Sequence, residues 1–224
     1  MRALRIRFKK TGRAKYISHL DVNRLMSRAV RRAGIPIWYT EGFNPHPYLG
    51  FPLPLSLGQE SDVEIMDIKV EDGCTNEEIT ERLNAVMPEG VEITEVYDPF
   101  CDIHEIDTAR YEIAAECEDE DTARTLTDEI SALVDSGEII SEKTGKKGRQ
   151  KVVKQINLCE FIRDFFASAE KNTINIGVTL PAGERININP SLLTAAFSSL
   201  KKAENLLFSI KRTQIFTKDG SIFR

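Results

Sequence analysis

The stretch Ala3–Gly12, ALRIRFKKTG, alternates apolar and basic side chains before it reaches a turn. The apolar members are Leu4, Ile6 and Phe8, and the basic members are Arg5, Arg7 and Lys9. Successive side chains of a strand point to opposite faces. The pattern therefore predicts a half-buried strand whose outer face is positive, followed by a turn at Lys10–Arg13.

A helix is expected after this strand. Ser18 stands where an N-cap belongs, and Asp21 occupies the third helical position. Gly34 and Pro36 predict that the helix ends near Ala33. The apolar residues at helical spacing are typical of a core-facing stripe: Leu25, Met26, Ala29, Val30 and Ala33.

The rest of the first half continues this alternation of strands and helices. Its expected elements are a strand at Ile35–Tyr39, a strand at Val63–Val70, a helix over Asn76–Ala85 capped by Thr75, and a strand at Val91–Tyr97. The order is β-α-β-β-α-β. That order is typical of the ferredoxin-like arrangement, in which two helices cover one face of an antiparallel sheet.

The second half repeats a similar order. Its expected elements are a strand at Tyr111–Glu116, a helix at Thr122–Val134, a hairpin of Glu138–Ser141 with Lys151–Asn157, a helix at Leu158–Ala167, a strand at Thr173–Leu180, a helix from Asn189-Pro190 to Ser198, and a strand at Leu206–Thr217. The sequence therefore predicts an α+β protein of two tandem ferredoxin-like domains with antiparallel sheets. Their expected bounds are residues 1–100 and 101–224.

Charge is segregated along the chain although the net charge is only −5. Residues 1–40 hold eleven Lys and Arg against one acid, whereas residues 41–100 hold fourteen acids and two bases. A second basic run lies between residues 143 and 154 and contains no acid. Such segregation indicates a surface for a polyanion such as RNA. The alternative is that the basic residues pair with the acidic segment in the folded chain.

The segment Glu41–Leu55, EGFNPHPYLGFPLPL, carries four prolines among apolar and aromatic residues. The prolines remove backbone donors and stiffen the chain. Asn44 and His46 are therefore candidates for contacts that need fixed geometry, while Phe51, Leu53 and Leu55 are expected to pack inward. The full set of candidate RNA-binding residues is Arg5, Arg7, Lys9, Lys10, Arg13, Lys15, Arg24, Arg28, Arg31, Arg32, Asn44, His46, Lys146, Lys147 and Arg149.

Several kinds of chemistry lack the motifs that they need. The four cysteines show no CxxC pair and no histidine at ligand spacing, so neither a metal site nor an iron–sulfur cluster is expected. Phosphate-binding glycine motifs and the aromatic motif of RRM domains are missing too. No cofactor is expected. Without an apolar run of membrane-spanning length or a signal peptide, the expected location is the cytoplasm.

A catalytic alternative rests on His19 and His46, with Asp21 two residues from His19. Two histidines and an acid could perform general acid–base cleavage of RNA if folding brings them together. The simpler interpretation is that His19 packs at a helix start and His46 bonds within its own loop. We therefore expect no catalytic residue and do not expect an enzyme.

A resemblance to a known family rests on KTGRAKYISHLD, RRAG and EGFNPHP in the first hundred residues. These motifs resemble the bacterial DUF2344 family, which is associated with radical-SAM proteins. The resemblance implies a radical-SAM partner, although the cluster motif CxxxCxxC is absent from this chain. We expect a non-catalytic RNA-binding module that works with a radical-SAM enzyme in RNA or ribosome-related modification. The alternatives are a metal-independent RNA endonuclease and a protein–protein adaptor.

Overall fold

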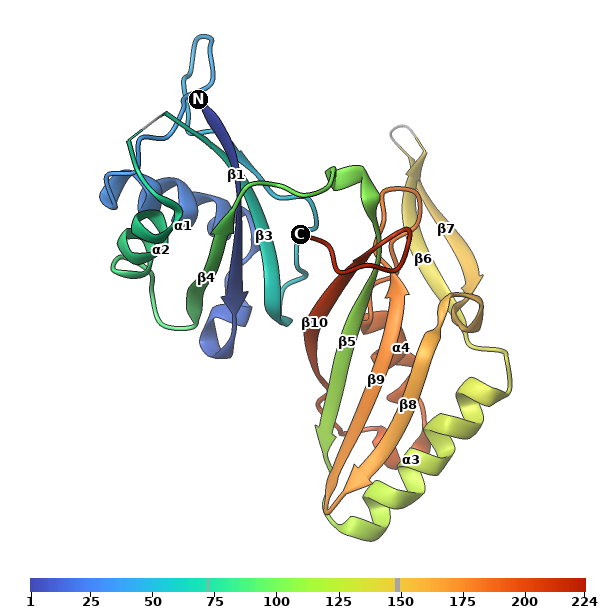
Figure 1. The fold of residues 1–224 in the computed structure, drawn as a ribbon. Coiled ribbons are helices and arrows are strands. Elements are labelled where there is room, and N and C mark those ends of the chain that lie inside the picture. The colour runs from blue at the N-terminus through green and yellow to red at the C-terminus, as the bar shows by residue number, and fades with distance from the viewer. Residues whose placement is uncertain (72, 148–149) are drawn as a thin grey trace. The chain divides into compact units, whose positions relative to one another are not determined.

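The computed structural model describes residues 1–71, 73–147 and 150–224. The fold is mixed α+β, and its strand pairing is mostly antiparallel (Figure 1). The chain divides into two compact units. Unit 1 comprises residues 1–107 together with 211–224, and unit 2 comprises residues 108–210.

Unit 1 is built from two helices and a small set of strands. Its elements are β1 (Arg2–Lys10), α1 (His19–Arg32), β2 (Leu49–Gly50), β3 (Glu60–Val70), α2 (Asn76–Asn84) and β4 (Val91–Tyr97), with short 3-10 helices at Gly12–Tyr16 and Ile103–Glu105. Most of β10 (Ser209–Thr217) also belongs to it. Strand β1 lies between β3 and β4 and is antiparallel to both. Both β2 and β10 pair with β3, the latter in parallel through Lys211 and Arg212.

The core of unit 1 lies between the strands and the two helices (Figure 1). Leu4, Ile6 and Phe8 of β1 are buried, as their alternation predicts. The side chains that meet them include Met26 and Val30 of α1, Met66 and Ile68 of β3, and Ile79 and Leu83 of α2. Helix α1 therefore turns its basic side away from the core.

Unit 2 contains the remaining elements. They are β5 (Ile106–Glu116), which begins at the boundary, α3 (Glu120–Asp135), β6 (Ile140–Lys147), β7 (Gln150–Asn157), β8 (Arg163–Glu170), β9 (Thr173–Pro181) and α4 (Ser191–Phe197). Strand β9 pairs antiparallel with both β5 and β8. Strands β6 and β7 form a separate antiparallel hairpin. Leu126 and Ile130 of α3 are buried, as are Ile176 and Val178 of β9.

The caps predicted for two helices are confirmed. The Ser18 hydroxyl accepts a hydrogen bond from the Asp21 amide, at 3.2 Å. Thr75 and Glu78 form a reciprocal capping box at the start of α2. The predicted basic hairpin is confirmed as β6 and β7. These features depend on residues three or four apart, or on neighbouring strands, which explains their visibility in the sequence.

Other predictions are wrong or only partly shown. Leu158–Ala167 is not a helix: a 3-10 turn at Leu158–Phe161 leads into strand β8. Ile35–Tyr39 forms isolated bridges instead of a strand. Two tandem ferredoxin-like domains are not confirmed as such. The expected division at residue 100 also differs from the observed units, because residues 211–224 return to unit 1.

Candidate nucleic-acid interface

Arg5 does not lie on an exposed positive face, which corrects the expectation from the sequence. Its side chain is 2% exposed. The guanidinium donates to both carboxylate oxygens of Asp67, at 2.8 and 3.0 Å, and to the backbone carbonyls of Cys101 and Arg224. Burial alone would lower the pKa of Arg5. The hydrogen bond and the attraction to Asp67 act in the opposite direction, and the net pKa is raised. Arg5 is a structural cation and cannot contact a ligand in this fold.

Lys10 needs the same correction. It is 2% exposed, and its Nζ donates to the Lys15 carbonyl oxygen at 3.2 Å. Burial lowers the pKa of Lys10, against the attraction of the Glu64 carboxylate. Arg5 and Lys10 are therefore not surface cations, and the prediction that they bind RNA is wrong.

The other cations of β1 and the following turn remain partly exposed but have partners. Lys9 lies 3.2 Å from Glu92, Lys15 lies 3.7 Å from Glu60, and Arg7 donates to the Gln214 side chain at 2.9 Å. The acidic residues come from the segment that the alternative interpretation proposed as their partner. Pairing with acids therefore accounts for Lys9 and Lys15, whereas Arg7 is bonded to an uncharged amide. Arg13 is exposed on the Gly12–Tyr16 turn.

Helix α1 is different. Arg24, Arg28, Arg31 and Arg32 are all exposed, and their spacing of three and four residues places them on neighbouring turns of the helix. We call these four residues the α1 arginine stripe. Arg24 pairs with the carboxylate of Asp21, at 3.0 Å. Within residues 1–71, 73–147 and 150–224, the other three arginines make no ion pair.

The Asp21 carboxylate is hydrogen-bonded within the first turns of α1. Its carboxylate accepts from the Ser18 hydroxyl at 2.7 Å and from Arg24 at 3.0 Å. These two hydrogen bonds lower the pKa of Asp21. A carboxylate with a depressed pKa is a weak base, so this geometry does not favour Asp21 as a catalytic group.

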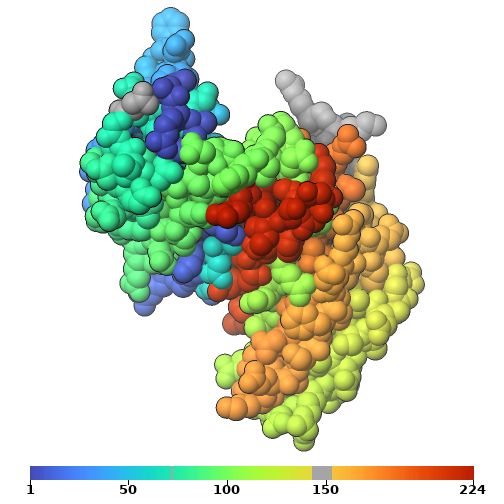
Figure 2. Space-filling model, viewed as in Figure 1, coloured from blue at the N-terminus to red at the C-terminus, as the bar shows by residue number. Residues whose placement is uncertain are grey.

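Next to the C-terminal end of α1 stands a projecting hairpin, residues Trp38–Tyr48, which we call the aromatic hairpin. It is the light-blue loop that extends from unit 1 in Figures 1 and 2. Its two arms are joined by a hydrogen bond from the Tyr48 amide to the Trp38 carbonyl at 3.0 Å, and by one from the Thr40 amide to the His46 carbonyl at 2.9 Å. The Arg31 guanidinium lies 5.9 Å from the Tyr39 ring centroid, which brings the hairpin to the end of the arginine stripe.

Asn44 and His46 lie on the aromatic hairpin, and both are exposed. His46 Nδ1 lies 3.0 Å from the Thr40 hydroxyl and 3.1 Å from the Asn44 carbonyl oxygen, while the His46 amide donates to the same hydroxyl at 3.2 Å. His46 therefore organises its own loop, as the simpler interpretation held.

No described contact joins His19 to His46. His19 is the first residue of α1, and its ring packs edge-on against Phe51, with centroids 5.3 Å apart. His46 belongs to the hairpin beside Arg31, twelve residues further along the helix. At 1.5 Å per residue, the two ends are about 18 Å apart. The geometry does not favour the two-histidine catalytic site.

Comparison with known families decides the membership of the chain. The model for DUF2344, described as an uncharacterized protein conserved in bacteria, matches residues 3–190. The chain belongs to DUF2344. A comparison of this DUF2344 chain with curated proteins finds no match.

Solved structures offer only remote likenesses to the DUF2344 chain. One is a chain of a Cbf5-Nop10-Gar1 complex, with a TM-score of 0.48, 11% identity, and coverage of 96% of this chain and 50% of that one. Another is an unknown protein from Galdieria sulphuraria, with a TM-score of 0.29, 10% identity and coverage of 94% and 98%. The chain thus spans about half the length of the first match.

The second basic run of the DUF2344 chain lies on the β6–β7 hairpin. Lys146 and Lys147 are in β6, where Lys146 is opposite Lys151. Arg149 lies outside the described residues, and so nothing further is drawn from it.

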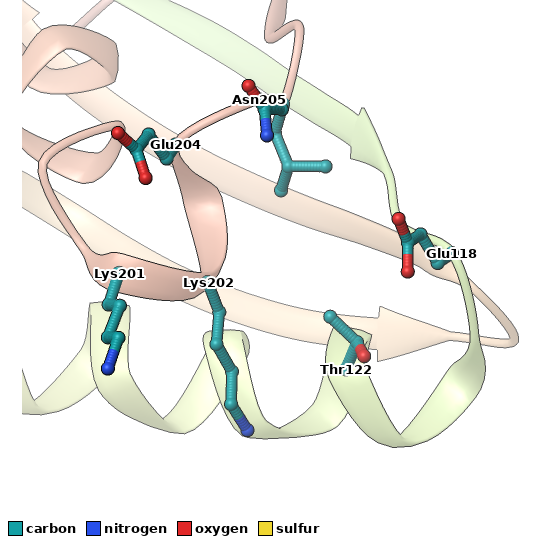
Figure 3. Close-up of a pocket in the computed structure, with 7 residues that line it drawn as sticks. Glu118, Thr122, Lys201, Lys202, Glu204 and Asn205 are labelled. Carbon is teal, nitrogen blue, oxygen red and sulfur yellow. The ribbon is translucent and has the colours of Figure 1, made fainter.

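Unit 2 of the DUF2344 chain contains a pocket of about 290 Å³ (Figure 3). It lies between the first turn of α3 and the segment after α4. Two lysines, two glutamates and three uncharged residues line it: Lys201, Lys202, Glu118, Glu204, Thr122, Asn205 and Leu206. Because the charges cancel, this pocket does not suit a polyanion, and we leave it out of the candidate interface.

Two features are absent from the described residues of this DUF2344 chain. These residues contain no group of three or more His, Cys, Asp or Glu residues placed to hold a metal ion. No helix among them combines the length and apolar character needed to span a bilayer.

Sequence reasoning missed the exposed rings that accompany the arginine stripe. Phe43, at the tip of the aromatic hairpin, is fully exposed, and Tyr16, just before α1, is 68% exposed. The position of Phe43 between Gly42 and Asn44, among turn-forming residues, was the available signal.

Proposed function

We propose that this chain binds RNA through the α1 arginine stripe and acts as a non-catalytic module that presents RNA to a radical-SAM partner enzyme. The observation that carries the proposal is the contrast between two sets of cations. Those of β1 are buried or paired, whereas Arg28, Arg31 and Arg32 point outward with no carboxylate partner among the described residues.

Arginines without a carboxylate partner are suited to bind phosphate. Arginine forms bidentate hydrogen bonds with phosphate and keeps its charge at all physiological pH values. Repulsion among four neighbouring guanidinium groups is unfavourable in the free protein and is relieved when phosphates lie between them. A rigid helix also holds the charges at fixed spacing, which a mobile basic tail does not.

The partner and the fold subtype belong to the same proposal. The radical-SAM partner rests on the family resemblance. Within the acidic stretch from Glu60 to Glu95, the exposed acids Glu77, Glu81 and Glu89 would steer a basic partner surface toward this chain. Each unit is proposed to be a divergent ferredoxin-like fold. The order β1-α1-β2-β3-α2-β4 supports this for unit 1. The order β5-α3-β8-β9-α4 supports it for unit 2, to which β10 contributes only Ser209 and Ile210.

The test is RNA binding across a range of salt concentrations. The triple variant Arg24→Glu, Arg28→Glu, Arg31→Glu should weaken binding. It should also flatten the plot of log affinity against log salt by about 0.7 to 0.9 units for each phosphate that the variant no longer binds. A filter-binding titration between about 50 and 200 mM salt measures both quantities.

A matched control reverses three exposed cations that lie elsewhere: Lys171→Glu, Arg185→Glu and Lys218→Glu. It changes the net charge equally but leaves the stripe intact. Equal loss of affinity in the two triple variants would mean that only net charge matters and would overturn the stripe as the site. If the parent protein does not bind RNA, the adaptor alternative is favoured.

A further inference from the structure

The aromatic hairpin presents a hydrophobic ring to solvent on a hydrogen-bonded support. Phe43 is fully exposed at its tip. The loop below is fixed by the three contacts among Thr40, Asn44 and His46, and the stem by the Tyr39–Pro47 bridge. An ordered segment loses little further entropy when it binds. The hairpin is thus built to hold this ring outward rather than to bury it.

Two cations lie against rings of the aromatic hairpin, Arg31 from α1 and Lys69 from β3. Arg31 lies 5.9 Å from the Tyr39 ring, and Lys69 Nζ lies 5.2 Å from the Trp38 ring and 4.7 Å from the Tyr48 ring. Proteins that bind single-stranded nucleic acid combine positive grooves for the backbone with aromatic rings on which bases stack. A duplex conceals the faces of its bases, so exposed rings add little to its recognition.

We propose that the RNA bound by this chain is single-stranded at the contact site, with an unpaired base stacked on Phe43 and its flanking phosphates held by Arg31 and Arg32. The inference rests on the proposed function and adds the class of RNA. It also assigns Phe43 a role that charge alone does not require. The hydrogen bonds of His46 then position the ring, and His46 performs no proton transfer.

The experiment measures fluorescence anisotropy with two probes: an unstructured oligouridine of about 12 nucleotides, within the usual site sizes, and a duplex RNA of similar length. Phe43→Ala should weaken oligouridine binding by about 5- to 150-fold, the range for loss of one stacked base. The salt slope should stay unchanged, because every phosphate stays bound. Binding of the duplex should change little.

Substitutions of graded chemistry separate stacking from general apolar contact. Phe43→Trp keeps a ring and should retain binding, whereas Phe43→Leu keeps apolar bulk without a ring and should behave like Phe43→Ala. Leu207→Ala, at a 91% exposed residue of unit 2, is the control for loss of surface apolar area. Because both positions are exposed, the free energy of unfolding of each variant should lie within about 0.5 kcal/mol of the parent value.

Each outcome has a distinct meaning. The single-strand inference is overturned if the parent protein binds oligouridine and duplex with equal affinity and Phe43→Ala does not change either affinity. That outcome would leave the arginine stripe as the proposed site. A variant that binds RNA normally but no longer associates with the radical-SAM protein would assign Phe43 to a protein contact and also overturn it. Failure of the parent protein to bind either probe would overturn the proposed function itself.

Discussion

Tyr97 buries a hydroxyl that has no hydrogen-bond partner in the described part of the chain. The side chain is 6% exposed, stacks on Phe100 at 6.0 Å and lies near the Arg224 guanidinium. Burial raises the pKa of Tyr97 to about 12, even though Arg5 and Arg7 favour its ionised form. A phenol in this position stays protonated over a wider pH range than it would in the unfolded chain.

Tyr97→Phe should therefore keep or slightly raise stability at neutral pH, because it removes a desolvated group that makes no bond. The alkaline behaviour should change more. In the parent, the unfolded chain loses the phenol proton near pH 10 and the folded chain near pH 12. Stability present below pH 10 is thus lost between these values, by on the order of 2 kcal/mol. Phenylalanine removes this loss.

Urea unfolding at several pH values from neutral to about pH 11 measures this effect. Tyr16→Phe, at an exposed tyrosine, serves as the control. A parent and a Tyr97→Phe variant with parallel pH profiles would contradict the assigned burial. A neutral-pH loss of several kcal/mol would mean that the hydroxyl has a bonding partner after all.

At the same scale, Arg5 shows what the sequence could and could not predict. The alternation in ALRIRFKKTG correctly predicts which β1 residues face the helices. It gives no sign that the opposite face is covered, because the Cys101 carbonyl and the Phe223 ring that cover Arg5 come from segments about 100 and 220 residues away. Local periodicity assigns faces but not what lies against them.

At the scale of elements, the aromatic hairpin depends on one hydroxyl. Thr40 Oγ1 contacts both the ring and the amide of His46. Thr40→Val should remove both bonds while keeping the shape of the side chain. We expect faster hydrogen exchange at the hairpin amides of Thr40 and Tyr48, with global stability nearly unchanged, because the hairpin lies outside the core. RNA affinity should fall, since Phe43 would lose its fixed position.

Thr40→Ser is the matched control, because it retains the hydroxyl. Hydrogen exchange monitored by mass spectrometry, with anisotropy on the same samples, gives both readouts. Unchanged exchange in Thr40→Val would show that the backbone bonds alone hold the hairpin. Faster exchange without any loss of affinity would separate hairpin order from RNA binding.

Strand β8 explains a failed prediction at this scale. The helix predicted over Leu158–Ala167 includes the first part of RDFFASAE, yet this segment pairs with β9. Phe165, Ala167 and Ala169 alternate with more exposed residues, which is the period of a strand. Pairing with the Ile-rich β9 outweighs weak helix propensity, as tertiary contacts commonly do.

At the scale of the whole molecule, unit 1 depends on residues that are distant in sequence. Arg212 of β10 is 1% exposed; it pairs with the buried Glu64 and donates to the Leu53 carbonyl at 2.9 Å. Removing residues 211–224 would leave Glu64 buried without this partner. Loss of one member of a buried ion pair costs about 3 to 5 kcal/mol. We expect the truncated chain to unfold at lower urea concentration.

Trp38 provides the measurement, because it is the single tryptophan of the chain and belongs to unit 1. Its fluorescence should show the earlier transition in the truncated chain. In the full chain, Arg212→Ala should reproduce much of the destabilisation. Replacing both partners, Arg212→Met with Glu64→Leu, should recover part of the stability. Unit 1 that unfolds identically with and without residues 211–224 would contradict the role given to this segment.

The return of residues 211–224 to unit 1 was beyond sequence reasoning for a physical reason. Element order predicts neighbours along the chain, and a division near residue 100 followed from a symmetric repeat. A parallel pairing of only two residues, Lys211 and Arg212 with Glu60 and Ser61, leaves no periodic signal. Nothing in the sequence distinguishes the buried pair, Glu64 and Arg212, from the many other acids and bases of the chain.

This discontinuity has a consequence for synthesis on the ribosome. Residues 1–107 emerge about 100 residues before the segment that completes their unit, which at 5–20 residues per second is a delay of about 5 to 20 s. During that delay the β3 groups that later pair with β10 are unpaired, and unpaired strand edges promote aggregation. A nascent chain therefore has a period in which chaperones can distinguish it from the finished protein. A chain that stops before residue 211 would keep this exposed edge and remain recognisable to quality control.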